Sequence, residues 1–344
     1  MKIIIDAMGG DNAPLEIVKG ALLGMEHWGV EVLLTGDTEA ILRALRDCGH
    51  DTIPHGMEIV HTTETVDMCD DPSKVFRHKK DTSMGVGLTL LRDGKADALV
   101  SAGSTGALLA GATLITKRIR GIRRAAMAPV IPTTGGRAVL IDCGANAECT
   151  PEYLLQFAYL GSFYAGRVLG LERPRVGLLN IGTEDTKGTP LQKEAYALLK
   201  DADEKGLLHF VGNVEGRDVP LGEVDVVVCD GFSGNVLLKS IEGTAMFMGS
   251  LMKRMFKKNL FSKLGYLLCS SGVKDMMKLM DYRQIGGTQF LGIRKPVIKA
   301  HGASDAVAFC NAVNQAAQAA QNDMTPELEQ ALRLLAETKE QQHD

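Results

Sequence analysis

Short turns of glycine and small polar residues follow apolar, strand-like runs eight times along this sequence. Such turns suit anion binding, because free backbone N–H groups and the lack of a bulky Cβ let the chain approach a ligand closely. In parallel sheets, ligands bind beyond the carboxyl ends of the strands. The pattern therefore indicates an α/β enzyme that handles phosphate. The runs with their turns are 3–11, 32–37, 98–106, 138–146, 177–184, 209–213, 226–235 and 297–305.

The turn SAGSTGA at 101–107 places three hydroxyls and two glycines between a buried strand and an apolar helix. Hydroxyls and amides that converge at one point can hold a phosphate without a charged side chain. Helix capping, the alternative, would need one hydroxyl and leave two without a role. We expect ligand contacts from Ser101, Gly103, Ser104, Thr105 and Gly106.

The turn DAMGGD at 6–11 ends the first run, and Pro14 opens a helix behind it. Two glycines allow close backbone approach to an anion, but the turn is not a GxGxxG sequence, so it does not indicate a dinucleotide. We expect substrate contacts from Asp6, Gly9, Gly10 and Asp11.

Two later turns supply a cation and an amide. Lys187 in NIGTEDTKG could reach an anion above the sheet, although an exposed loop lysine would look the same. Asn235 in DGFSGN could donate to a carbonyl oxygen that becomes negative, or could cap the following helix. Further substrate-site candidates at such strand ends are Asn146, Asn180, Thr183, Glu184, Asp230, Ser233, Gly234 and His301.

No nucleophile elbow, HExxH motif, Walker A loop or metal-ligand spacing is present, and no cofactor motif is assigned. A reaction in which bound phosphate attacks directly would need no protein nucleophile. A thioester suits it, because a thiol of pKa about 8.5 leaves with little protonation. Anion positioning, an oxyanion donor and an apolar acyl slot would then suffice.

The apolar runs alternate with helical patterns, which is the order of a parallel sheet covered by helices. We expect helices at 14–28, 152–169 and 191–203, one that begins in the 234–235 turn, and one over 304–321 capped by Ser304. No linker divides residues 1–321, which we interpret as one catalytic α/β domain. Residues 322–344 are predicted to be a charged helical tail.

The formal net charge of −4 does not support nucleic acid as a partner. Seven cysteines without CxxC spacing, and no signal peptide, predict reduced thiols in the cytoplasm. No apolar stretch reaches the roughly 18 residues needed to span a bilayer.

Residues 244–281 break the pattern, with seven of the fifteen methionines and seven basic residues. Methionine and phenylalanine beside lysine describe an amphipathic helix that meets anionic headgroups and acyl chains. A core-facing helix pair or a dimer contact is the alternative. The apolar candidates for membrane contact are Phe247, Leu251, Met255, Leu260, Phe261 and Leu264.

Six motifs stand in the order of one family: DAMGGDNAP at 6–14, SAGSTGALLAG at 101–111, LIDCGAN at 140–146, NIGTEDTKG at 180–188, DGFSGNV at 230–236 and KAHGASD at 299–305. From residue 2 to about 321 the sequence resembles the bacterial phosphate acyltransferases. These convert acyl-[acyl-carrier-protein] and inorganic phosphate to acyl phosphate at the start of phospholipid synthesis. The family usually has Asn where Ser104 stands.

The resemblance implies a three-layer α/β/α fold with a mostly parallel sheet, related to isocitrate and isopropylmalate dehydrogenases and phosphate acetyltransferases. It implies a homodimer attached peripherally to the inner face of the cell membrane, with acyl carrier protein as donor partner. A glycerol-3-phosphate acyltransferase would use the acyl phosphate downstream. Carried over by motif, Lys187 and Asn235 are the catalytic candidates.

Three other functions stay open on the sequence. A phosphate acetyltransferase would need no apolar platform like 244–281. A nicotinamide-dependent dehydrogenase of the isocitrate type would need a nucleotide loop and metal-binding aspartates, neither of which is assigned. A non-catalytic membrane scaffold would bind liposomes without turnover.

Overall fold

The computed structural model describes residues 1–344 except 68, 280–285, 323–324, 327 and 331–344. Most of the predicted tail at 322–344 lies outside the described residues, as do residues 280 and 281 of the amphipathic segment.

The first sheet takes its strands from both ends of the chain. Over the described residues it has seven strands, in the order β3-β2-β1-β4-β12-β11-β5. Strand β11 runs antiparallel to both of its neighbours, and the other pairs are parallel. The bounds are β3 Met57–His61, β2 Glu31–Gly36, β1 Lys2–Asp6, β4 Ala98–Ser101, β12 Val297–Ala300, β11 Gly287–Leu291 and β5 Ala126–Ala128.

The second sheet is built from one continuous stretch of chain. Its five strands have the order β6-β7-β10-β8-β9, and β6 is antiparallel to β7 while the others are parallel. The bounds are β6 Val130–Thr133, β7 Gly136–Ile141, β10 Val226–Val228, β8 Val176–Asn180 and β9 Phe210–Glu215.

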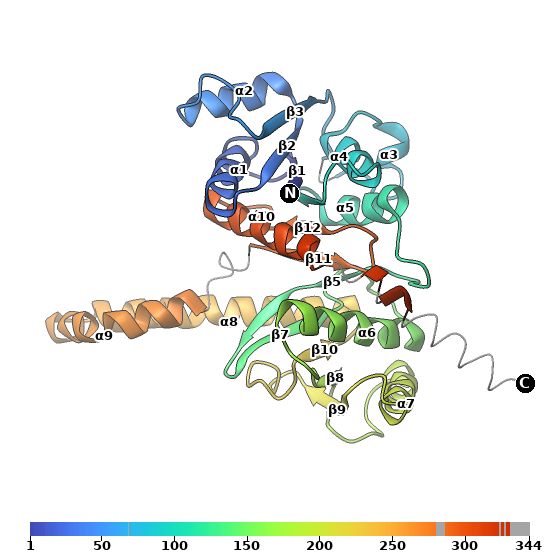
Figure 1. The fold of residues 1–344 in the computed structure, drawn as a ribbon. Coiled ribbons are helices and arrows are strands. Elements are labelled where there is room, and N and C mark those ends of the chain that lie inside the picture. Colours follow the sequence, from blue (N-terminus) through green and yellow to red (C-terminus); the bar gives the residue numbers. More distant parts are fainter. Residues whose placement is uncertain (68, 280–285, 323–324, 327, 331–344) are drawn as a thin grey trace, which may run out of the picture.

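Helices surround the two sheets, which lie one above the other in Figure 1. Their bounds are α1 Leu15–Trp28, α2 Thr38–Asp47, α3 Val75–His78, α4 Ser83–Arg92, α5 Thr105–Gly111, the π-helical turn η1 Ala112–Thr116, α6 Pro151–Val168, α7 Pro190–Glu204, α8 Gly231–Lys257, α9 Leu260–Leu279 and α10 Ala306–Gln321.

Both sheets are buried on both faces. Ile3 and Ile5 of β1 pack with α1, α2 and α10, whereas Ile4 packs on the opposite side with α4 and α5. In the second sheet, α6 and α7 cover one face. The first turns of α8 cover the other, where Leu237 packs against the cluster that contains Leu140. This gives the predicted three-layer α/β/α arrangement with mostly parallel strands, here as two sheets.

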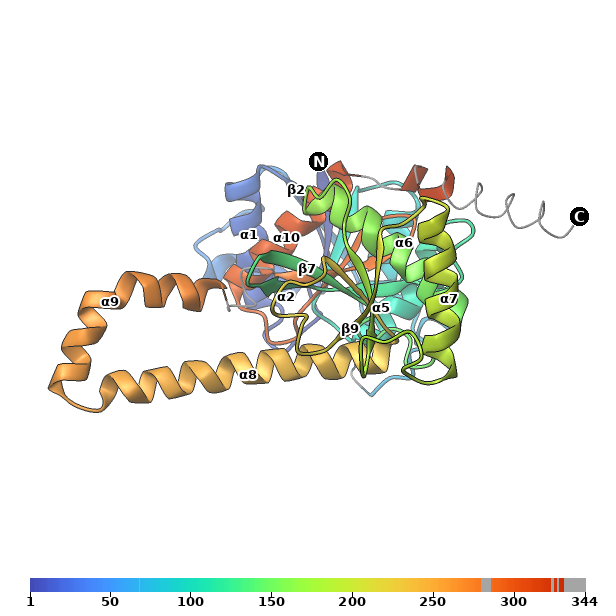
Figure 2. The same ribbon diagram turned by 90° about the horizontal axis from the view of Figure 1, so that it is seen from below.

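Helices α8 and α9 project from the body as an arm (Figures 1 and 2). Near the bend between them, the rings of Phe256 and Tyr266 stack edge to face, with their centroids 5.2 Å apart. Five of the six predicted membrane-contact side chains are exposed, led by Leu260 at 80% and Phe261 at 85%, and Leu251 is half-buried. None of the described helices combines the length and the apolar character needed to cross a bilayer.

All eight predicted apolar runs contain a strand. Two helix starts were predicted wrongly. Asp305, not Ser304, caps α10 by accepting from the Ala308 N–H. Helix α8 begins at Gly231, before the predicted start at 234–235, because Asp230 already caps it. The capping alternative for Asn235 is therefore excluded.

Candidate functional site

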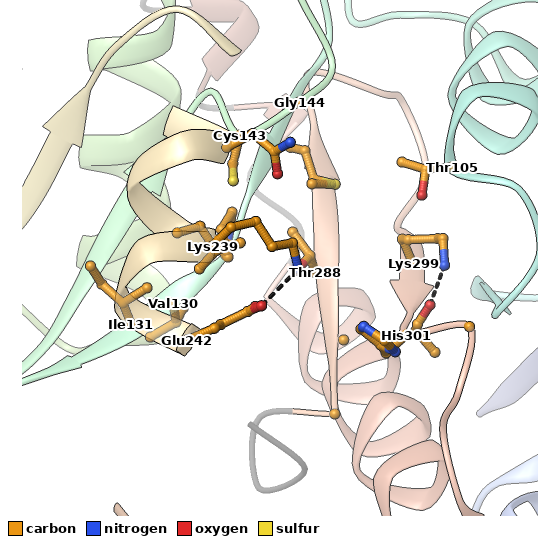
Figure 3. Close-up of a pocket in the computed structure, with 18 of the residues that line it drawn as sticks. Thr105, Val130, Ile131, Cys143, Gly144, Lys239, Glu242, Thr288, Lys299 and His301 are labelled. Atoms are coloured by element: carbon orange, nitrogen blue, oxygen red, sulfur yellow. Dashed lines mark hydrogen bonds and ion pairs between the residues drawn. The ribbon is translucent and has the colours of Figure 1, made fainter. Parts of the chain in front are cut away.

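A cleft of about 1160 Å³ lies where the two sheets meet (Figure 3). The first sheet contributes the turns after β1 and β4 and the end of β12. The second sheet contributes β6, the turn after β7 and the first turns of α8. Seven predicted site residues line the cleft: Gly10, Asp11, Gly103, Ser104, Thr105, Asn235 and His301.

The wall formed by the first sheet is polar. Lys299 projects from β12, and its ammonium donates to the carbonyl oxygens of Ala102, at 3.3 Å, and Ala300. Burial lowers the pKa of Lys299 to about 8. Burial, with Lys239 and Lys299 nearby, also lowers the pKa of His301, whose Nδ1 accepts from a backbone N–H at 3.2 Å.

The opposite wall is largely apolar. Its side chains from the β6 region and α8 are Val130, Ile131, Pro132, Leu237, Leu238 and Ile241. Lys239 also lies on this wall, but its Nζ is paired with Glu242 at 2.7 Å. Asn235 stands in the first turns of α8, next to Gly144 in the turn after β7.

Asp6, Gly9 and Ser101 are predicted site residues that do not line the cleft. They hold the turn after β1 in place. The Asp6 carboxylate accepts from the hydroxyls of Ser83 and Ser101, both at 2.6 Å, and burial raises its pKa. Ser101 Oγ in turn accepts from the Gly103 N–H at 3.1 Å. A Cβ at Gly9 would lie 2.6 Å from Asp6 Oδ2, so this turn needs glycine there. Gly106 lies on α5 near Pro72 and also stands outside the cleft lining.

A second buried carboxylate holds the turn after β7. Asp142 accepts from the backbone N–H groups of Met127, Cys143 and Asn146 and from the Asn146 amide, at 2.6–2.9 Å. A Cβ at Gly234 would come 2.0 Å from the Asp142 carbonyl oxygen. Asn146 therefore holds the Asp142 carboxylate by hydrogen bonds, and the missing Cβ of Gly234 lets α8 lie close to this turn. Asp230 and Ser233 bond to each other at the start of α8.

The four candidates of the 180–188 loop stand apart from the cleft lining. Lys187 is 46% exposed at its side chain and lies 3.9 Å from Glu184. Asn180 donates to the Lys187 carbonyl at 3.2 Å, and Thr183 is exposed.

The residues that sequence reasoning missed are Lys299, Thr288, Lys239 and Glu242 in the cleft, and Asp142 beneath it. A signal for Lys299 was present, because it is a charged residue inside the apolar strand Val297–Ala300. Within the described residues, no group of three or more His, Cys, Asp or Glu side chains is placed to hold a metal ion.

Comparison with solved structures identifies the class of fold. A phosphotransacetylase from Streptococcus pyogenes matches with a TM-score of 0.61 at 18% identity, over 92% of this chain and 94% of that one. A 4-hydroxythreonine-4-phosphate dehydrogenase from Klebsiella pneumoniae matches with a TM-score of 0.54 at 14% identity, over 93% and 99%. The protein thus has the three-layer α/β/α fold of these enzymes.

Sequence comparison then identifies the family. The family model described as "Fatty acid synthesis protein" matches residues 1–326. A phosphate acyltransferase from Alkaliphilus oremlandii is 46% identical over 337 residues, covering 98% of this chain and 99% of the relative. One from Clostridioides difficile is 42% identical over 345 residues, covering both chains fully. The chain belongs to the phosphate acyltransferase family, as the motifs predicted, and is an acyltransferase.

Proposed function

We propose that this protein transfers a long-chain fatty acyl group from acyl carrier protein to inorganic phosphate, giving acyl phosphate for phospholipid synthesis. The observation that carries the proposal is the cleft itself. A wall with hydroxyls and a lysine faces an apolar wall, and Asn235 lies beside the turn that joins β7 to the cleft. Phosphate and an acyl thioester would bind against walls of matching chemistry.

The reaction follows from that arrangement. A phosphate oxygen attacks the thioester carbonyl carbon, a C–O bond forms, and the carbonyl oxygen becomes an oxyanion. We assign to the Asn235 amide, which lines the cleft, the role of donor to that oxygen. The C–S bond then breaks and the thiolate leaves. The acyl phosphate gives up the proton that hydrogen phosphate carried and the thiolate is protonated, with water as the carrier, so no net proton is exchanged. Lys187 stays a catalytic candidate through the family motif, without support from the cleft geometry.

The apolar wall favours a long acyl chain as the substrate. Leu237, Leu238 and Ile241 succeed one another along α8, and Val130 and Ile131 face the same space. Burying the apolar surface of one such side chain contributes about 1.5–3 kcal/mol of free energy. An acetyl group would leave most of this wall without a partner.

The direct test is phosphate-dependent release of free thiol from long-chain acyl carrier protein. We expect release to require phosphate, and acetyl-CoA to be a much poorer donor. Equal or faster release from acetyl-CoA would make the protein a phosphate acetyltransferase, and thiol release without phosphate would make it a thioesterase.

Assembly and location extend the proposal. We propose that residues 1–321 act as one catalytic unit, because both sheets line one cleft. The exposed apolar side chains of α8 and α9 support a homodimer contact, peripheral attachment to the inner, anionic face of the cell membrane, or both. The acyl phosphate would pass to a glycerol-3-phosphate acyltransferase there.

A further inference from the structure

Lys299 is a cation set into the centre of the first sheet. Register places it between Ser101 of β4 and Thr288 of β11, both uncharged. Its side chain lines the cleft, and its ammonium lies beneath Thr105 in Figure 3. Lys299 is half-buried, and a lysine withdrawn this far from solvent usually has a partner or a function.

The ammonium of Lys299 has no close carboxylate. Among the described residues no carboxylate oxygen lies within 4.0 Å of its Nζ, although Asp11 and Asp6 are near enough to act through space. Lys239 across the cleft is different, because its ammonium is already paired with Glu242. A desolvated cation without an ion pair interacts strongly with any anion that reaches it.

Within the described part of the chain, two of the three N–H groups of the Lys299 ammonium have a hydrogen-bond acceptor, and one does not. An ammonium has three N–H groups, and the carbonyls of Ala102 and Ala300 accept two of them. These bonds also hold the side chain against the wall, so little conformational freedom is lost when a ligand binds. The third N–H is available to a ligand in the cleft.

We propose that Lys299 binds the acceptor phosphate, with the Thr105 hydroxyl beside it, and holds it against the polar wall for attack on the thioester. This assignment rests on the proposed function, since it takes inorganic phosphate as the acceptor. It places the charge that binds phosphate on β12, not on the 180–188 loop, where Lys187 is outside the cleft lining.

The test compares Lys299→Met with Lys299→Arg and with the exposed control Lys200→Met in the thiol-release assay. Loss of a charge-assisted bond predicts that Lys299→Met raises the phosphate KM about 10- to 100-fold, with the KM for acyl carrier protein little changed. Lys200→Met should match the wild type. An unchanged phosphate KM in folded Lys299→Met would overturn the proposal.

The pH profile gives a second readout. With a pKa near 8 in the free enzyme, Lys299 is cationic below that pH and neutral above it. Wild-type kcat/KM for phosphate should therefore fall as pH rises through about 8. Lys299→Arg keeps its charge at high pH, so its profile should stay level there.

Other titratable groups surround this position. Asp6 and Asp11 act from the β1 side, and His301 follows directly after β12. Lys239 and Glu242 act on His301 from α8 across the cleft. Asp305 caps the following helix. A fall near pH 8 that persists in Lys299→Arg would count against the proposal.

Calorimetry with inorganic phosphate alone separates this proposal from the proposed function. If the wild type binds phosphate and Lys299→Met does not, the site stands even when acyl carrier protein gives no turnover. If both bind equally, the Lys299 assignment fails whatever the acyl donor. Should Lys299→Met not fold, the pH profile of Lys299→Arg decides.

Discussion

The two walls of the cleft differ in chemistry because they come from different sheets. The first sheet presents Lys299, Thr105 and His301, whereas the second presents Leu238, Ile241 and their apolar neighbours. Polar and apolar side chains are thereby separated between the two walls. A substitution on one wall should affect one substrate and leave the other largely unchanged.

The supports behind the walls are buried carboxylates with different donors. Asp6 in the first sheet is satisfied by two hydroxyls, and Asp142 in the second chiefly by backbone N–H groups. Burial raises the pKa of both carboxyls. Each acid fixes a turn beneath the cleft, so the walls are held in place by groups that need not contact substrate.

Asn235→Ala tests the boundary between the walls and should have the largest effect. If the amide stabilises an oxyanion, kcat should fall about 10²- to 10³-fold with little change in either KM. Steady-state kinetics measure this, and Val236→Ala, an exposed neighbour outside the cleft lining, is the matched control. A lowered melting temperature with kcat intact would give Asn235 a structural role only.

Ile241→Ser tests the apolar wall. Removing this side chain should lower kcat/KM for long-chain acyl donors about tenfold or more, since its burial is worth about 1.5–3 kcal/mol. The phosphate KM should not change. Val307→Ser, an exposed apolar position on α10, is the control. An equal loss with acetyl-CoA would show that the wall does not contact the chain.

Leu260→Glu tests whether the apolar surface of the arm is separate from that of the cleft. We expect binding to anionic liposomes to drop about tenfold in a flotation assay, while turnover of acyl carrier protein in solution persists. Leu114→Glu, an exposed leucine on the body, should bind as the wild type does. A shift to monomer in light scattering would instead place Leu260 in a dimer interface.

Salt should have the smallest effect, a few-fold rise in the KM for acyl carrier protein between about 0.05 and 0.3 M. An acidic carrier would need a local basic patch on this negatively charged chain. The candidates are Lys117, Arg118, Arg120, Arg123 and Arg124, or the lysines of 253–263. If the carrier binds the first patch, Arg120→Glu should reduce the salt dependence of this KM. If it binds the second patch, Lys257→Glu should do so. A KM independent of salt would exclude both.

The sequence predicts the strands that are buried on both faces, because a short, continuous apolar run bounded by turn residues is typical of such a strand. It does not predict β3, whose Met57–His61 pattern is half exposed, or the short antiparallel strands β5, β6 and β11. Nor does it show that the runs divide between two sheets, since those of β4 and β10 look alike.

The sequence predicts the residues of the candidate site that lie in turns, but not Lys299, which lies in strand β12. Ser104, Thr105 and Asn235 stand out because polar residues gather in their turns, although Ser104 also caps α5 and Ser101 bonds to Asp6. In the sequence Lys299 is one residue of a strand, whereas Lys187 attracts attention because it lies in a loop. Which loops face the cleft depends on how the two sheets pack, and local sequence does not contain that information.

The path of the chain sets the order in which the cleft is completed. The second sheet uses residues 130–228 alone, but β12 inserts between β4 and β11 in the first sheet, and α10 then packs on α1. Contacts so distant in sequence form slowly, and chains emerge from the ribosome with their N-terminal end first. During synthesis the apolar wall can therefore form early, while Lys299 arrives with the last strand. A nascent chain that stops before β11 holds one wall of the cleft and lacks the strand that carries Lys299 on the other.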